Sequence, residues 1–218
     1  MVLLISPSFV ALSLAAVLAA PVAQGLQTSK PEPKADTLKT VMLSAPGIEQ
    51  PFSQADVEFM QGMIPHHAQA VKMGGWAPTR GSNKQLLVLC ERIVVGQRDE
   101  INMMRQWLSD RGQEVPAADA MRHKMKMGDM VHDMLMPGMM TDEEMAALEK
   151  ARGKEWDRLF LIGMIKHHEG AVKMVEELMH THGGATGDDM FKFASDVFAD
   201  QSTEIEVMKQ MLAAIKGE

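Results

Sequence analysis

The sequence predicts an all-α protein, a four-helix bundle made of two repeated helical hairpins. The first observation is a segment that the chain uses twice, since residues 56–73 return as residues 157–174 at a constant offset of 101 residues. The second is a further repeat, because residues 97–108 match residues 201–212 in their Gln, Glu, Ile, Met and Leu positions. Two copies of a helix pair supply the four helices of a bundle. No β-branched run alternates with period two, so we expect no strand.

Start and stop signals place the helices along the chain. Ser53 followed by Asp56 resembles a helix-start box, and Thr141 with Glu144 is a full capping box. Ser82 begins a third signal of this kind. Paired glycines stop helices because they readily adopt the left-handed backbone at a helix end. These signals predict long helices over residues 53–75, 82–112, 153–183 and 188–216, with a short helix after residue 141.

The chain divides into three parts by composition. Residues 1–25 read as a secretory signal, because residues 2–23 are apolar and uncharged and end in small residues, although the usual Lys or Arg is missing. A retained membrane anchor is the alternative, and membrane contact is expected only in that case. Residues 26–51 form a flexible tether, and residues 52–218 form the bundle domain, with repeat halves 52–112 and 153–216 joined by a Met/His-rich linker, 115–141. We therefore expect a periplasmic or otherwise exported protein.

Charge and cysteine content exclude several kinds of function. The net charge of −7 and pI near 5.6 argue against nucleic acid as a partner, which would require a basic face. Cys90 is the only cysteine and cannot form an internal disulfide. It lies in an apolar run that suits a buried helix position better than a catalytic thiol. The sequence contains no hydrolytic triad, phosphate loop or nucleotide motif, so we predict no catalytic residues and no enzyme.

Each repeated segment carries adjacent histidines beside methionines. A methionine followed at the third and fourth positions by histidines places three donors within one helical turn, where they can converge on an ion. Imidazole and thioether together favour copper, and Cu(I) above all, because thioether sulfur is a poor ligand for hard cations. The predicted metal ligands on these helices are Met63, His66, His67, Met73, Met164, His167, His168 and Met174.

Carboxylates and amides on the same helix faces would orient the histidines. A histidine that binds metal usually donates its other N–H to a carboxylate or carbonyl. The residues expected in this role are Asp56, Gln97, Glu100, Asp157, Gln201 and Glu204. The alternative is a metal-free network that only fixes helix register. Neither helix pair supplies, in register with the His-His motif, the Glu-x-x-His motif of carboxylate-bridged di-iron sites, which disfavours oxygen-activating chemistry.

The linker gives the strongest metal signal. Residues 121–127 and 130–136 both read Met-x-His-x-Met-x-Met. A core helix would repeat its apolar residues every three or four positions, whereas these donors recur at every second position between charged residues. Closely spaced Met and His suit capture of soft cations, copper or silver, against the alternatives of adaptable packing or membrane contact. The linker ligands predicted are His123, Met125, Met127, His132, Met134 and Met136.

These motifs also carry a family resemblance. The Gly138-Met-Met-Thr-Asp-Glu-Glu-Met segment and the two His-His runs resemble the family known as domain of unknown function 305. The resemblance covers about residues 54–212, nearly all of the predicted mature chain. The resemblance implies a ferritin-like four-helix bundle and an exported protein, and some members are described as periplasmic copper-binding proteins. It implies no established catalytic activity.

Three functions follow, from different classes. The leading prediction is an exported copper-binding protein that sequesters Cu(I), with Ag(I) as a mimic, or hands it to a copper-transfer partner, and so supports metal tolerance. The second is a metal-dependent, cuproxidase-like redox enzyme that uses the His and carboxylate residues of the bundle. The third is a metal-free interaction module whose Met-rich linker contacts another protein.

Overall fold

The computed structural model describes residues 47, 50–127 and 130–216 of the 218-residue chain. The predicted signal segment and most of the predicted tether lie outside these residues. Contacts group Lys39–Glu218 into one unit, which holds every described residue. Among the described residues, no helix has both the length and the apolar character needed to cross a membrane.

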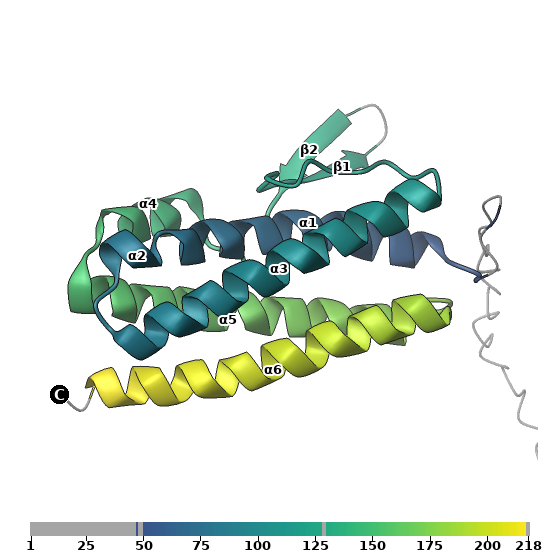
Figure 1. Cartoon of the computed structure of the whole chain (residues 1–218). Coiled ribbons are helices and arrows are strands. Elements are labelled where there is room, and N and C mark those ends of the chain that lie inside the picture. The colour runs from purple at the N-terminus through teal and green to yellow at the C-terminus, as the bar shows by residue number, and fades with distance from the viewer. Residues whose placement is uncertain (1–46, 48–49, 128–129, 217–218) are drawn as a thin grey trace, which may run out of the picture. The chain divides into compact units, whose positions relative to one another are not determined.

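Four long helices make up most of the described part of the chain, which confirms the predicted all-α fold (Figure 1). Helix α1 packs against α3, helix α5 packs against α6, and the α1–α5 contact joins the two hairpins. The short helices α2 and α4 lie before the second and third long helices. The bounds are α1 Gln54–Gly75, α2 Ala77–Arg80, α3 Lys84–Asp110, α4 Asp142–Lys150, α5 Gly153–His180 and α6 Asp188–Lys216.

Capping side chains set where the helices begin. Ser53 and Asp56 cap α1 reciprocally, and Thr141 and Glu144 do the same for α4, as predicted. At α3 the predicted start was wrong by one residue. Asn83 is the N-cap and accepts from the backbone N–H groups of the first turn, because the hydroxyl of Ser82 is already used in a hydrogen bond to another helix.

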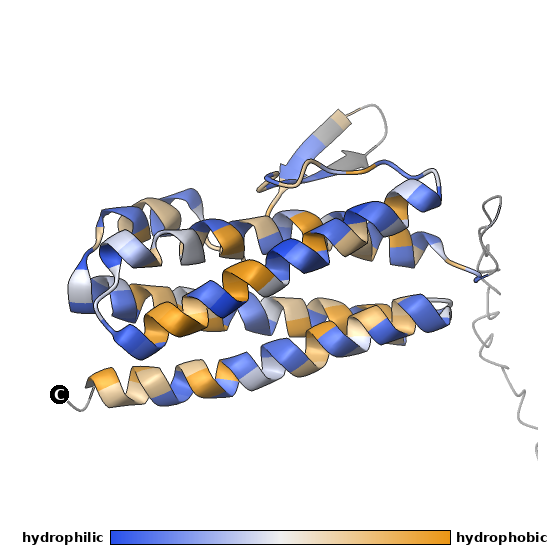
Figure 2. Ribbon diagram, in the orientation of Figure 1, coloured by the Kyte–Doolittle hydropathy of each residue, from blue (hydrophilic) through white to orange (hydrophobic). Residues whose placement is uncertain are grey.

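The interior of the bundle combines apolar side chains with buried methionines and histidines. Figure 2 shows polar and apolar residues interleaved along every long helix, as expected for helices with one buried face. Trp156 stacks on Phe160 with 4.8 Å between ring centroids. Met63 and Met164, at equivalent places in the two repeats, are fully buried. Thioethers therefore fill part of the core, and packing accounts for their position without a metal.

The linker contains a β-hairpin, so the expectation of no strand was wrong. Strands β1 (His123–Met127) and β2 (Met130–Met134) pair in antiparallel register. The alternation of Met and His with other residues is itself a period of two, which is the period of a strand. The strands carry no β-branched pattern, because they are built mainly from methionine, histidine and lysine, which are not typical strand residues.

Candidate metal centre

The hairpin places five of the six predicted linker ligands on one face, together with Met130, while Met136 follows the end of β2. His123 pairs with Met134, Met125 with His132, and Met127 with Met130. Directly opposed residues share a face of a two-stranded sheet, with Cβ atoms about 4.5–5.5 Å apart, and alternate residues of a strand do the same. The intervening pairs lie on the opposite face, where Lys124 pairs with Asp133. The register therefore gathers imidazole and thioether residues on one face, while the pairs Lys124–Asp133 and Lys126–Val131 belong to the other.

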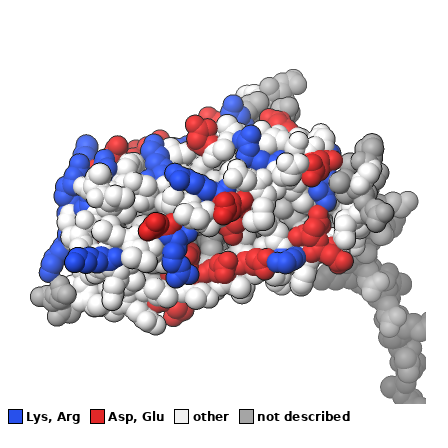
Figure 3. Space-filling model, in the orientation of Figure 1, with Lys and Arg blue, Asp and Glu red and all other residues white. Residues whose placement is uncertain are grey.

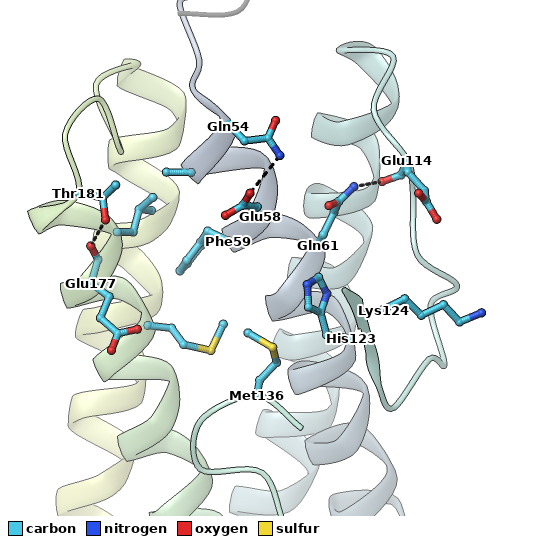
Figure 4. A pocket seen from close by; sticks show the side chains of 13 residues that line it. Gln54, Glu58, Phe59, Gln61, Glu114, His123, Lys124, Met136, Glu177 and Thr181 are labelled. Atoms are coloured by element: carbon cyan, nitrogen blue, oxygen red, sulfur yellow. Dashed lines mark hydrogen bonds between the residues drawn. The ribbon is translucent and has the colours of Figure 1, made fainter. Parts of the chain in front are cut away.

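One end of this hairpin lies against the bundle, at a cavity of about 940 Å³. His123 is 8% exposed and lines the cavity together with Met136 of the linker and Met174 of α5. Figure 4 shows His123 and Met136 beside each other on the cavity wall, while Lys124 points away. The structure thus brings a predicted linker histidine and a predicted helix methionine to one place. Met130, near the turn of the hairpin, is 64% exposed.

Glycines of the repeated motif make room for the linker methionines. The methyl carbon of Met136 lies 2.7 Å from the point where a Cβ of Gly62 would be, and that of Met174 lies 3.6 Å from it. Gly163, the equivalent residue in α5, has the sulfur of Met140 at 2.6 Å from its Cβ position. Each copy of the motif is therefore covered by one methionine from the linker. Met140 was not among the predicted ligands.

The four histidines of the repeated motif are buried with their Nε2 atoms engaged. His67 Nε2 donates to Glu100 Oε2 and His168 Nε2 to Glu204 Oε2, both at 2.8 Å. The remaining two donate to backbone carbonyls, His66 to that of Pro137 at 3.0 Å and His167 to that of His66 at 2.9 Å. A carbonyl oxygen only accepts, so these hydrogen bonds place the proton on Nε2 of His66 and His167.

The Nδ1 atoms are consequently the available ligand atoms. All four are buried and have no hydrogen-bond partner among the described residues. Unpartnered buried acceptors fit a metal site, since a metal ion would satisfy them. Yet no group of three or more His, Cys, Asp and Glu side chains in the described part of the chain is arranged to hold an ion. An ion in this core would need thioether or amide donors as well.

The central pair of histidines is held in the neutral form. His66 and His167 lie with ring centroids 3.7 Å apart. Burial lowers the pKa of both imidazoles well below the usual value, and nearby histidines lower it further. Protonation would place two charges side by side in the interior, which is costly. Both rings are therefore neutral near pH 7, the form in which imidazole ligates a metal.

This arrangement predicts that the metal-free protein loses stability in mild acid. Because the folded pKa is lowered, the unfolded chain binds more protons below about pH 6.5, and each histidine costs about 1.4 kcal/mol per pH unit. Denaturant unfolding between about pH 7.5 and 5.5 measures this slope. The double variant His66→Gln, His167→Gln should flatten it, whereas His180→Gln, at an exposed histidine, should not. A pH-independent midpoint for the unsubstituted protein would contradict the prediction.

Two of the four predicted carboxylates do not contact the histidines. Asp56 accepts hydrogen bonds from Ser53 at the start of α1 and from the backbone N–H of Ala185. Asp157 accepts from the backbone N–H and hydroxyl of Ser82 and from the N–H of Asn83. Both therefore fix the loop that enters a neighbouring helix, and their predicted role beside the histidines was wrong.

Sequence reasoning also missed the segment that returns from the hairpin to α4. The carbonyl of Pro137 accepts from His66, and the amide of Gln69 forms two hydrogen bonds with the backbone of Met140, at 3.0 and 2.7 Å. Gln69 occupies the position equivalent to Gly170 in the second repeat. This difference between the two repeats was the one available sequence signal that the segment after the hairpin crosses the bundle at these positions.

The fold and this interior define a helical-bundle protein with buried, paired histidines and a Met/His hairpin. The chain belongs to the family described as Domain of unknown function (DUF305), whose model matches residues 56–212, which confirms the resemblance noted from the motifs. A short stretch of 56 residues is 36% identical to the uncharacterized protein L153 of Acanthamoeba polyphaga mimivirus, covering 26% of this chain and 37% of that protein. The chain thus spans little more than a third of that relative's length.

Solved structures of two DUF305 proteins and of CopM are similar to this chain. A putative secreted DUF305 protein from Streptomyces coelicolor is 27% identical with a TM-score of 0.62, covering 74% of this chain and 94% of that one. A DUF305 fragment from Deinococcus radiodurans is 25% identical with a TM-score of 0.60, covering 75% and 98%. CopM in the Cu(I)-bound form is 28% identical with a TM-score of 0.55, covering 73% and 96%. CopM has also been solved with Ag and with Cu(II).

Proposed function

We propose that this protein is an exported copper-binding protein that sequesters Cu(I), or hands it on, through its Met/His hairpin. The observation that carries the proposal is the register of the hairpin, which sets six imidazole and thioether residues on one face. Such donors select soft ions such as Cu(I) and Ag(I) over hard cations. The charged pair of Lys124 and Asp133 belongs to the opposite face of the register.

The junction of hairpin and bundle supports the same function. His123 is buried there at the edge of a cavity that Met136 and Met174 also line. An imidazole and two thioethers are a suitable donor set for one Cu(I) ion, and the cavity is large enough for the side chains to adjust. The relationship to CopM, solved with Cu(I), Cu(II) and Ag, supports copper as the ion.

Export is the second part of the proposal. The apolar, uncharged residues 2–23 are typical of a secretory signal, and the relative from Streptomyces coelicolor is a putative secreted protein. Outside the cytoplasm, a protein that binds Cu(I) limits the free ion and supports metal tolerance. We propose binding rather than catalysis, because the candidate ligands are imidazole and thioether groups, which hold a soft ion.

A titration with Cu(I) tests the proposal. The purified protein, kept anaerobic and reduced, is expected to remove at least one Cu(I) per chain from a coloured competing chelator. Stoichiometry is read from the loss of chelator absorbance, with Ag(I) as a second soft ion. Absence of uptake would overturn the proposal. Sustained oxygen consumption by the copper-loaded protein in air would replace it with the cuproxidase-like function.

A further inference from the structure

A second, smaller pocket lies between α3 and α6, on the side of the bundle away from the proposed copper site. Its volume is about 250 Å³. Gln97 and Glu100 line it from α3, and Gln201 and Glu204, their equivalents in the second repeat, line it from α6. Asp200 is a further lining residue, which has no acidic counterpart in α3 because Gly96 stands there. Equivalent polar residues of both repeats therefore meet at this pocket.

The pocket carries an excess of negative charge. Glu100, Asp200 and Glu204 contribute three carboxylates, and Arg92 is the one cationic lining side chain. Figure 3 shows acidic side chains gathered near the centre of this face of the molecule. Partial desolvation raises the pKa of Asp200, which is otherwise exposed, and the charges of Glu100, Glu204 and Asp196 raise it further, while Arg92 lowers it. A cation in the pocket would relieve this repulsion.

Two buried amides also face the pocket without partners. Gln97 is 4% exposed and Gln201 is 2% exposed. Neither the amide nitrogen nor the amide oxygen of either residue has a hydrogen-bond partner among the described residues. A buried polar group left unpaired costs about 1–3 kcal/mol, so such groups need an explanation, and a bound ion is one. The same unpaired residue occurs at the same place in both repeats, which argues against an accident of packing.

We propose that this pocket binds a divalent cation that prefers oxygen ligands, through the carboxylates of Glu100, Asp200 and Glu204 and the amide oxygens of Gln97 and Gln201. The donor set is carboxylate and amide oxygen, which suits the Mg²⁺, Ca²⁺ and Mn²⁺ class and not soft Cu(I). This site is separate from the proposed copper site in both its ligands and its ion.

Amides and water have to complete the coordination shell. Glu100 and Glu204 each use one oxygen for a histidine. No three His, Cys, Asp or Glu side chains in the described ranges converge on an ion by themselves. Cations of this class often bind through one or two carboxylates and keep several waters. A water molecule takes up about 30 Å³, so the pocket has room for an ion and part of its hydration shell.

Mn²⁺ is the probe that tests the site, since bound and free Mn²⁺ differ in their electron paramagnetic resonance signal. The full chain is expected to bind one Mn²⁺. Asp200→Asn is expected to weaken that binding at least tenfold, because mutating even a residue that only orients a metal ligand typically lowers metal affinity about 10–100-fold. Asp196→Asn is the matched control. It removes the same charge one turn earlier in α6, where Asp196 pairs with Lys192 and does not line the pocket.

A second variant separates the amides from the charge. Gln97→Met with Gln201→Met keeps similar side-chain volume and removes the unpaired polar atoms, so it should abolish Mn²⁺ binding while the metal-free protein becomes no less stable. Absence of Mn²⁺ binding by the unsubstituted protein would overturn the proposal. So would equal weakening by Asp196→Asn, which would show a diffuse surface effect. Cu(I) uptake by the Asp200→Asn variant should stay unchanged. The proposal of this cation site and the proposal of the copper site are therefore tested independently.

Discussion

Replacing Gly170 by alanine is expected to lower the free energy of unfolding by about 3 kcal/mol. A Cβ at this position in α5 would lie 2.0 Å from the carbonyl oxygen of Pro137 and 2.7 Å from the Cα of Gly138. These are backbone atoms, so no side-chain rotation relieves the clash. The same carbonyl accepts the hydrogen bond from buried His66, and moving it would leave that Nε2–H unpaired, which adds to the cost. Urea unfolding monitored by circular dichroism measures the change.

Gly96→Ala is the matched control for this variant. Gly96 also lies inside a long helix, but nothing comes within 4 Å of its Cβ position. Alanine there should raise the free energy of unfolding by about 0.5–1 kcal/mol, because it favours the helix and restricts the unfolded chain. Similar effects from the two substitutions would mean that the returning linker does not press against α5.

Changing the hairpin methionines to leucine is expected to reduce Cu(I) uptake by about one ion per chain or more. Leucine keeps the apolar volume and removes the sulfur lone pairs, so the helices should keep their stability. The variant replaces Met125, Met127 and Met134 of the hairpin together with Met136, which follows it in the linker. Anaerobic titration against a chelator gives the stoichiometry, and thermal unfolding of the metal-free form checks the fold.

The control for the hairpin variant uses methionines elsewhere on the surface. Met103 of α3 is 53% exposed and Met179 of α5 is 38% exposed, and neither belongs to the hairpin or its cavity. Changing both to leucine should leave Cu(I) uptake unaltered. If the hairpin variant also keeps its full stoichiometry, the hairpin is a packing segment and the buried histidines are the remaining place for the ion.

The fold could be predicted from the sequence because its signals are local. The capping pairs at Ser53 and Thr141 satisfy backbone N–H groups within one turn, so their effect depends little on the rest of the chain. The repeat then supplied the topology. The start of α3 was misplaced because Ser82 is used by Asp157, a residue 75 positions away, and no local pattern reveals such a bond.

The site was predicted less completely, for a geometric reason. Residues on one face of a helix point in the same direction but lie at different positions along the helix axis. Asp56 precedes His66 by ten residues, which at about 1.5 Å per residue is far beyond hydrogen-bond reach. Glu100 reaches His67, and Glu204 reaches His168, because the two helices of each helical hairpin lie side by side at these residues. The crossing of Pro137 over Gly170 depends on tertiary approach alone, and only the break in the repeat at Gln69 hinted at it.

The two helical hairpins, α1–α3 and α5–α6, are each contiguous in sequence, and this has a consequence for folding kinetics. The α1–α3 and α5–α6 contacts join neighbouring stretches of chain, whereas the α1–α5 contact joins segments 101 residues apart, as in the hydrogen bond from His167 to the carbonyl of His66. Closing a long loop costs more entropy before any contact repays it. The two helical hairpins are therefore expected to form early. The docking of α1 on α5 is expected to come later and to limit the folding rate. Substitutions at the His66–His167 contact should then mainly slow docking, while substitutions inside one hairpin should change the population of a partly folded intermediate.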